Sequence, residues 1–250
     1  MNLQTNPQSP EPAYESAPLS LAGRVAIEAV MPEIDAGAWP IKSTVGEAIA
    51  VAADVFSDGH DVIACDLLWR RERDAHWLRE PMLQLGNDRW GACFTPKQTG
   101  LFKYTIEAWR DPFATWAADA VKKFDAGQSI DLELIEAGHV LENVSGDGPQ
   151  ALLWQLRANV VDPEAQIKLL TSQQTLTMMR ALGQREDVSG YERILTAIID
   201  RERASFSAWY EMFPRSAAND KHRHGAFRDV TARLDYIRDL GFNVLYFPPI

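Results

Sequence analysis

The chain has 250 residues, of which 46% are hydrophobic and 24% are charged, an ordinary composition for a globular protein. Its formal net charge of −10, without any basic stripe, argues against a nucleic-acid backbone as partner, since Lys122-Lys123 is only an isolated pair. No apolar stretch approaches the roughly 20 residues needed to cross a membrane, so we expect no membrane partner.

The first residues carry no sign of a packed structure. Residues 1–20 are polar and include four prolines, without the basic region and apolar core of a targeting peptide. We predict a disordered tail over this range. The chain has two cysteines, Cys65 and Cys93. Two cysteines at this length, without a secretory leader, favour a reduced cytoplasmic protein over a disulfide-linked secreted one.

Residues 21–128 are predicted to form an amino-terminal β-sandwich with the helix that follows it. Apolar and polar residues alternate along residues 25–30 and 48–56, and turn residues occur at 57–59 and 86–88. This spacing is typical of an antiparallel, immunoglobulin-like sandwich. Further strands are expected at residues 62–70, 77–85, 89–94 and 102–109.

Tryptophans are frequent in this region and have two possible roles. Large aromatic side chains at alternating strand positions usually pack in the core, which is the favoured interpretation. The alternative is a platform on which sugar rings stack, and for that role we expect the exposed residue to be Trp39, beside Pro40, or Trp77. The tryptophans concerned are Trp39, Trp69, Trp77, Trp90, Trp109 and Trp116.

After Asp111, the apolar residues no longer alternate with polar ones but recur at the spacing of a helix. A helix that follows Pro112 is predicted to end near Gly127, and residues 129–204 are predicted to form a helical region that joins the sandwich to the last segment. Residues 145–149, Ser-Gly-Asp-Gly-Pro, are typical of a linker. Helices are expected within residues 131–143, 151–160, 163–182 and 191–203, and Pro163 after Asp162 suits a first helical turn.

Residues 205–250 are predicted to form a strand-helix-strand unit with parallel strands. Aromatic and β-branched runs at residues 206–213 and 241–247 flank one amphipathic helix, and Gly241 suits its C-cap. A parallel pair with one helix neither closes a sheet nor fills a barrel, so we expect an incomplete domain of a larger protein. A free amphipathic helix is the disfavoured alternative. One face of the helix carries Phe227, Val230, Leu234, Ile237 and Leu240.

Motifs that indicate chemistry on their own are scarce. His222 and His224 lack the third ligand and the carboxylate that a zinc site needs, so a loop is the favoured interpretation. The sequence has no glycine-rich phosphate loop, no Cys-x-x-Cys pair and no nucleophile elbow. We therefore expect neither a metal nor a cofactor.

The loops that follow the two strands are the expected functional face, because barrel enzymes carry their working residues at the carboxyl ends of strands. Residues 213–216 and 248–250 take these positions. Arg215 and Ser216 are the candidate substrate-binding residues. For Arg215, contact with an anionic group and bracing of the loop by a salt bridge are both open, and bracing is favoured.

The fragments in their order resemble a known family. Residues 209–216, Trp-Tyr-Glu-Met-Phe-Pro-Arg-Ser, are similar to the opening of the α-amylase superfamily barrel (glycoside hydrolase family 13), and so are residues 224–227 and 241–250. More narrowly, the chain resembles the α-1,4-glucan:maltose-1-phosphate maltosyltransferases over nearly everything after residue 20. Their amino-terminal domain is matched by residues 39–42, 45–47, 59–60, 94–96, 100–102 and 109–116.

The resemblance implies a retaining transfer of maltosyl units from α-maltose 1-phosphate to the non-reducing end of α-1,4-glucans such as glycogen, with release of phosphate. In this family a nucleophilic Asp and an acid/base Glu perform the reaction. Both belong to later barrel strands, beyond Ile250, as do the basic residues that hold the phosphate, so this chain alone is expected to be inactive. In the family that the chain resembles, a helical region in or near the amino-terminal domain takes part in a homodimer, so a homodimer is expected here. Residues 217–220 lack the glycines expected there, which leaves the shape of that loop open.

Two alternatives remain. One is a hydrolase or branching enzyme of the same superfamily, which shares the barrel opening but not usually this sandwich and helical region. The other is a non-catalytic module for glycan binding or dimerisation.

Overall fold

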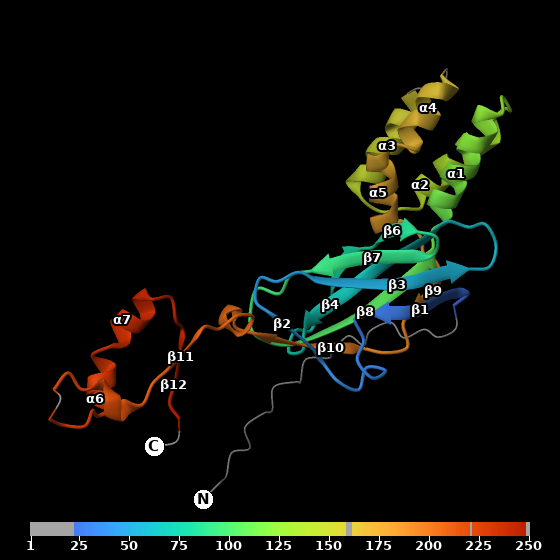
Figure 1. Ribbon diagram of the computed structural model, residues 1–250. Helices are drawn as coiled ribbons and strands as arrows, with labels where there is room; N and C mark the ends of the chain where they lie inside the picture. Colours follow the sequence, from blue (N-terminus) through green and yellow to red (C-terminus); the bar gives the residue numbers. More distant parts are fainter. Residues whose placement is uncertain (1–22, 159–161, 221, 249–250) are drawn as a thin grey trace, which may run out of the picture. The chain divides into compact units, whose positions relative to one another are not determined.

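The computed structural model describes residues 23–158, 162–220 and 222–248 (Figure 1). The tail expected at residues 1–20 lies outside this range. The chain forms two compact units, one made of the chain up to Ile41, Ala48–Phe94 and Leu101–Ala197, the other of Lys42–Glu47, Thr95–Gly100 and Ile198–Ile250. Within the described residues, no helix is both long enough and apolar enough to span a lipid bilayer.

Two β-sheets contain most of the strands. The four-stranded sheet has the order β1-β3-β7-β6, and the six-stranded sheet has the order β2-β10-β8-β4-β5, with β9 also paired to β8. Neighbours β1 and β3, β3 and β7, and β4 and β8 run antiparallel. The strands are β1 (Val25–Met31), β2 (Ile41–Thr44), β3 (Ile49–Ser57), β4 (Ile63–Arg71), β5 (Leu78–Pro81), β6 (Leu83–Gly86), β7 (Arg89–Phe94), β8 (Gly100–Arg110), β9 (Glu186–Gly190) and β10 (Leu195–Asp200).

Aromatic side chains from both sheets meet in one core. The ring of Trp69 on β4 stacks on Phe94 of β7 with centroids 5.1 Å apart, and Phe94 lies 5.8 Å from Tyr104 of β8. The Tyr104 hydroxyl donates a hydrogen bond of 2.6 Å to the Pro32 carbonyl, so its polar end is satisfied inside the protein. The faces of the two sheets therefore pack directly against each other.

Burial patterns show which faces are covered. Along β3, the side chains of Ile49, Val51, Ala53 and Val55 are buried while intervening residues are not, the period-2 pattern of a strand with one covered face. Strand β4 is instead buried continuously from Ala64 to Leu68. Both faces of β4 must therefore be covered, one by the opposite sheet and the other by a different layer.

The sequence predicts most of these strands, but one prediction joins two strands, two strands are missed, and β10 lies where a helix is expected. The single strand expected at residues 77–85 is wrong, because β5 and β6 belong to different sheets. The chain changes sheet at Met82, whose side chain is fully buried and whose amide donates to the Cys65 carbonyl at 2.9 Å. Strands β2 and β9, of four and five residues, carry too little periodicity to be predicted.

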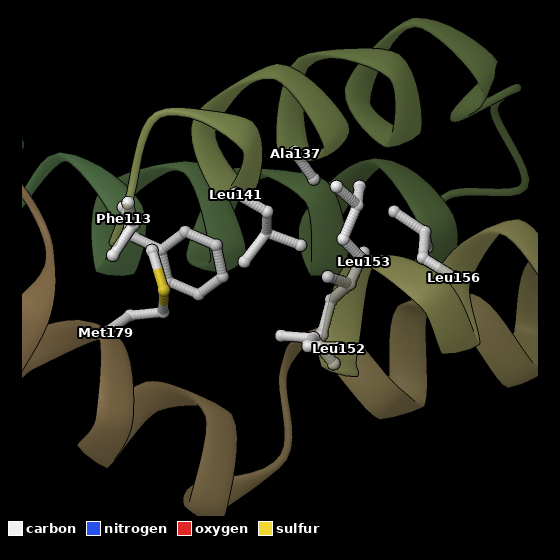
Figure 2. Packing of buried hydrophobic residues seen from close by; sticks show 9 residues of the cluster. Phe113, Ala137, Leu141, Leu152, Leu153, Leu156 and Met179 are labelled. Atoms are coloured by element: carbon white, nitrogen blue, oxygen red, sulfur yellow. The ribbon is translucent and has the colours of Figure 1, made fainter. Parts of the chain in front are cut away.

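Helices α1–α5 lie together on one side of the sheets (Figure 1). They pack around a cluster of buried residues that Figure 2 shows from close by. The helices are α1 (Pro112–Asp125), α2 (Asp131–Glu142), α3 (Asp147–Ala158), α4 (Pro163–Leu170) and α5 (Gln173–Leu182). The cluster consists of Phe113, Ala137, Leu141, Val144, Leu152, Leu153, Leu156, Leu170 and Met179.

Side-chain caps fix where several helices begin. Asp111 accepts from the Ala114 amide at 2.9 Å, and Asp162 accepts from the Ala165 amide at 3.0 Å, each just before a proline in the first turn. Ser172 caps α5 by accepting from the Thr175 amide at 3.3 Å. Its extended backbone, with ψ of 148°, divides the single helix expected at residues 163–182 into α4 and α5.

The helix expected at residues 191–203 is wrong. Strand β10 occupies Leu195–Asp200 and a short 3-10 helix, η1, occupies Glu202–Ala204. The buried residues of β10 are Leu195, Ala197 and Ile199, which is strict alternation. The linker expected at residues 145–149 is also shorter than predicted, because α3 begins at Asp147 and takes Pro149 into its first turn.

A network of ion pairs connects α5 to the sheet that it covers. Asp66 on β4 and Glu107 on β8 are cross-strand neighbours, and both side chains are buried. Arg180 on α5 donates to Asp66 Oδ1 at 3.2 Å and to the Cys65 carbonyl at 2.6 Å. Arg185, just after α5, donates to Glu107 Oε1 at 2.8 Å, and its guanidinium lies 3.8 Å from the centroid of the Trp109 ring. Arg79 on β5 donates to the same Glu107 oxygen at 2.5 Å.

The second unit contains the predicted parallel pair. Strands β11 (Trp209–Glu211) and β12 (Val244–Tyr246) are parallel, with Tyr210 opposite Leu245. Both are shorter than the runs that predicted them. The intervening helix is divided into α6 (Phe227–Thr231) and α7 (Leu234–Asp239), and Gly241 ends α7 with the positive φ, 92°, expected of a left-handed C-cap.

Asp229 organises the beginning of α6. Its Oδ2 accepts a hydrogen bond from the Ala226 amide at 2.8 Å. Arg223 donates two more hydrogen bonds, from Nη1 to Oδ2 at 2.8 Å and from Nη2 to Oδ1 at 2.6 Å. The bidentate hydrogen bonds from Arg223, followed by that from the Ala226 amide, hold the pKa of the Asp229 carboxyl well below its usual range.

We expect Leu141→Ala to lower the free energy of opening of α2 and α3 by about 3 kcal/mol, because it leaves a cavity in a closed cluster. Val140→Ala on the same helix is the matched control, since Val140 is 38% exposed against 0% for Leu141 and is not part of the apolar surface that carries Leu132 and Ile135. Its effect should stay below about 0.5 kcal/mol. Hydrogen exchange of the α2 and α3 amides measures both values, and equal effects of the two variants would contradict the packing described here.

We expect Asp229→Asn to speed hydrogen exchange of the Ala226 and α6 amides at neutral pH. The folded-state pKa of Asp229 is lowered, so its stabilisation is present above the ordinary carboxyl range and is lost as pH falls below about 4. The difference between wild type and variant, corrected for intrinsic exchange rates, should therefore shrink at low pH. Asp235→Asn, in an exposed pair with Arg238, is the control. A difference that grows on acidification would refute the assignment.

Candidate functional site

The carboxyl ends of β11 and β12 meet at one edge because the strands are parallel and in register. The last pair in the register is Glu211 with Tyr246, and the Met212 amide extends it by donating to the Tyr246 carbonyl at 3.2 Å. A short 3-10 helix, η2 (Pro214–Ala217), follows β11 directly. The segments after both strands therefore lie at the edge where the sequence predicts the functional face.

The amino ends of the same strands are joined by Asn243. Its Oδ1 accepts from the Ala208 amide at 2.9 Å, while its own amide donates to the Ala208 carbonyl at 3.1 Å. These bonds close the strand pair at the end opposite η2. Sequence reasoning missed this role, although an Asn between Phe242 and Val244 in an otherwise apolar run is a signal for it.

Backbone contacts hold η2 in place. The Ser216 amide donates to the Phe213 carbonyl at 2.9 Å, and the Gly225 amide donates to the Arg215 carbonyl at 2.8 Å. Gly225 lies so close to η2 that a Cβ atom on it would stand 2.3 Å from the Pro214 carbonyl oxygen. Only glycine permits this approach, so Gly225 positions the loop before α6 against η2. Residues 224–227 contribute to the family resemblance, but the sequence alone assigns Gly225 no role.

Arg215 and Ser216 are both exposed on η2. Within residues 23–158, 162–220 and 222–248, the Arg215 guanidinium has no ion pair and no side-chain hydrogen bond. The salt bridge favoured for Arg215 is thus not found among these residues. Arg223 instead makes the bracing ion pair of this region, with Asp229. The arrangement leaves the Arg215 side chain available to an anionic group at the edge of the strand pair.

This unit exposes many large apolar side chains and buries few. On α6 and α7, Val230 and Ile237 are buried, whereas Phe227, Leu234 and Leu240 of the same predicted face are about half exposed. The strand residues Trp209 and Tyr246 are 59% and 42% exposed. Exposed apolar surface of this kind is typical of a face that packs against further structure.

Of the six tryptophans between residues 39 and 116, one is exposed and the others are buried or half-buried. Trp39 is 65% exposed, whereas Trp77 is half-buried with the Arg70 guanidinium 4.8 Å from its ring centroid. The others pack within the structure. Trp69 stacks on Phe94, Trp90 donates to the Val55 carbonyl at 3.2 Å, Trp109 is buried, and Trp116 contacts Phe113 with ring centroids 5.3 Å apart.

His222 and His224 are exposed and lie in the loop before α6. In the part of the chain that the structure describes, no group of three His, Cys, Asp or Glu side chains is placed to hold a metal ion.

Known proteins resemble the chain along its length. A relative from Cereibacter sphaeroides, α-1,4-glucan:maltose-1-phosphate maltosyltransferase, is 42% identical over 256 residues, covering 100% of this chain and 38% of the relative. A protein of the same name from Chlorobaculum tepidum is 37% identical over 246 residues, covering 96% and 37%. One from Streptomyces coelicolor, with the name ending in 1, is 34% identical over 241 residues, covering 92% and 36%. The chain thus spans less than two-fifths of the length of these relatives.

The family model that matches the chain describes domain N/S of α-1,4-glucan:maltose-1-phosphate maltosyltransferase, and it covers residues 23–201. This range contains both sheets and helices α1–α5. Since the match extends over more than half of the residues, the chain belongs to the α-1,4-glucan:maltose-1-phosphate maltosyltransferase family through its N/S domain.

Proposed function

We propose that this chain is the amino-terminal part of an enzyme that transfers maltosyl units from α-maltose 1-phosphate to the non-reducing end of α-1,4-glucans, with retention and release of phosphate. The observation that carries the proposal is the match over 91–100% of the chain to relatives that all bear this name. The N/S family model supports it independently over residues 23–201.

The fold proposed for the whole protein has three parts. The two packed sheets are an immunoglobulin-like sandwich, α1–α5 are a helical bundle, and β11, α6, α7 and β12 are the first strand-helix-strand unit of a (β/α)₈ barrel. The parallel register of β11 and β12 supports the barrel, as does the exposed apolar surface of Phe227, Leu240 and Tyr246, which further strands and helices would cover.

The proposed chemistry uses two carboxylates on later barrel strands. An Asp attacks the anomeric carbon to form a glycosyl-enzyme intermediate while a Glu gives its proton to the leaving phosphate. The Glu carboxylate then takes the proton of the acceptor hydroxyl, whose oxygen displaces the Asp from the anomeric carbon. This chain's contribution lies on η2, where the exposed residues Arg215 and Ser216 stand at the carboxyl edge of the strand pair. There Arg215 would be an additional donor to the anionic group, beside the basic residues that the resemblance places beyond Ile250, with the Gly225 hydrogen bond holding its backbone in position.

The enzyme is proposed to be a cytoplasmic homodimer that associates through its helical region. Large apolar residues exposed on the helices support this assignment: Leu132 and Ile135 on α2 and Trp154 on α3 are 63%, 59% and 72% exposed. A subunit contact would remove this surface from water.

The alternative of a glycan-binding module draws support from Trp39, which is exposed beside Pro40 and offers a flat face to a sugar ring. Two results together would favour this alternative over the transferase. This chain would bind glycogen, and the full-length gene product would release no phosphate from maltose 1-phosphate.

The full-length gene product is expected to release phosphate from α-maltose 1-phosphate only when an α-1,4-glucan is present, and to lengthen that glucan. The 250-residue chain alone should release none. A colorimetric phosphate assay with and without glycogen, followed by chromatography of the glucan, measures both. Release of free maltose at the same rate without a glucan would identify a hydrolase and overturn the proposal.

In the full-length protein, Arg215→Ala is expected to raise the KM for maltose 1-phosphate by about tenfold or more, because a charge-assisted hydrogen bond contributes about 1.5–3 kcal/mol. The effect on kcat should be smaller, since the contact is made with bound donor throughout. Arg238→Ala is the control, as Arg238 is an exposed arginine on α7 that pairs with Asp235 and Asp239. Equal KM values for the two variants would remove Arg215 from the donor site.

A further inference from the structure

A cavity of about 510 Å³ lies in the first unit between helix α5 and the edge strands of both sheets. Three arginines of the network around Asp66 and Glu107 line it: Arg79 from β5, Arg180 from α5 and Arg185 from the segment after α5. The rest of its wall is largely apolar and includes Leu83, Trp90 and Leu176. The cavity therefore combines a cationic end with an apolar body.

The charges in this cavity are arranged with the cations outermost. The side chains of Asp66 and Glu107 are 7% and 4% exposed, whereas those of Arg180 and Arg185 are each 24% exposed and that of Arg79 is 39% exposed. Asp111 also lines the cavity, but it is buried and its Oδ1 accepts from the Ala114 amide. A molecule that enters therefore meets guanidinium groups before it meets carboxylates.

The guanidinium groups retain donors that the network does not use. Arg79 donates to the carboxylates only through Nη1, and Arg180 donates only through Nη2. Within the ranges that the structure describes, Arg79 Nη2 and Arg180 Nη1 have no hydrogen-bond acceptor. Planar guanidinium forks of this kind match the two oxygens of a carboxylate or a phosphate.

We propose that this cavity binds a small molecule in which one oxyanion, a carboxylate or a phosphate, is attached to an apolar ring. The oxyanion accepts from the unused N–H groups of Arg79 and Arg180, and the ring lies against Trp90, Leu83 and Leu176. The volume suits such a molecule, since ligand sites usually measure about 300–1,000 Å³. This site lies entirely within the first unit and does not depend on maltosyl transfer.

Calorimetric titration of the 250-residue chain with benzoate, phenyl phosphate and benzyl alcohol tests the proposal. Benzoate or phenyl phosphate should bind at least about tenfold more tightly than benzyl alcohol, which has the ring without the charge and so lacks one charge-assisted hydrogen bond. The stronger of the two charged probes identifies the oxyanion. No binding of either, or equal binding of benzyl alcohol, would overturn the proposal and leave the arginines with a structural role only.

Two variants on α5 locate the binding. Ala181 lines the cavity from an exposed position, so Ala181→Phe fills the space without touching the ion pairs and should weaken binding by about tenfold or more. Gln174→Phe places the same ring on an exposed position of α5 that does not line the cavity, and binding should not change. Unchanged binding by Ala181→Phe would overturn the site.

Arg180→Lys provides a second measure, because it keeps the charge and removes the fork. The affinity for the charged probe should fall while helix content, followed by circular dichroism, stays at the wild-type value. An unchanged affinity would exclude Arg180 from the site and overturn the proposal.

Discussion

The pair of buried carboxylates at the centre of the six-stranded sheet is the constraint on which the first unit depends. Asp66 and Glu107 stand directly opposite each other on β4 and β8, where like charges destabilise a sheet. An unpaired charge at such a place costs on the order of 3–5 kcal/mol. The pairing comes from Arg79 on a neighbouring strand and from Arg180 and Arg185, which arrive only when α5 lies on the sheet. The sheet therefore supplies one of the three cations itself, and α5 with the segment after it supplies the other two.

The same contact explains why the two middle strands are buried on both faces. Cys65 and Leu67 face the aromatic core between the sheets, whereas Asp66 and Leu68 face the opposite side, and all four are buried. On β8, Trp109 lies on the side of Glu107 and is covered by the Arg185 guanidinium. The six-stranded sheet and the helical region thus meet at one interface, which contains both the ion pairs of Asp66 and Glu107 and the contact of Arg185 with Trp109. This agrees with a family model that covers both sheets and helices α1–α5 in one range, residues 23–201.

Local patterns in the sequence predict local structure well here, and long-range pairing poorly. Alternation predicts β3, and the Asp-Pro pairs 111–112 and 162–163 predict helix starts, because each signal depends on neighbouring residues only. Residues 195–200 satisfy both a helical and a strand pattern, and their pairing in the six-stranded sheet decides for the strand. Two partners of Asp66, Arg180 on α5 and Arg185 just after it, lie more than 100 residues away in the sequence, so no local window reveals them. For the functional edge, the positions of Arg215 and Ser216 follow from strand order, whereas the contact of Gly225 with η2 requires coordinates.

The two units contribute different evidence on function, and the difference lies in how each is stabilised. The first unit buries a continuous core and satisfies its central charges, so the N/S match over residues 23–201 concerns a structure that is complete in packing terms. The second unit has three-residue strands, two short helices and half-exposed aromatic side chains, which is too little buried surface for independent stability. Its parallel register still requires a crossover on a covered sheet. The barrel proposed for the whole protein would cover the exposed apolar side chains of this unit, which also carries Arg215 at the edge where donor chemistry is proposed.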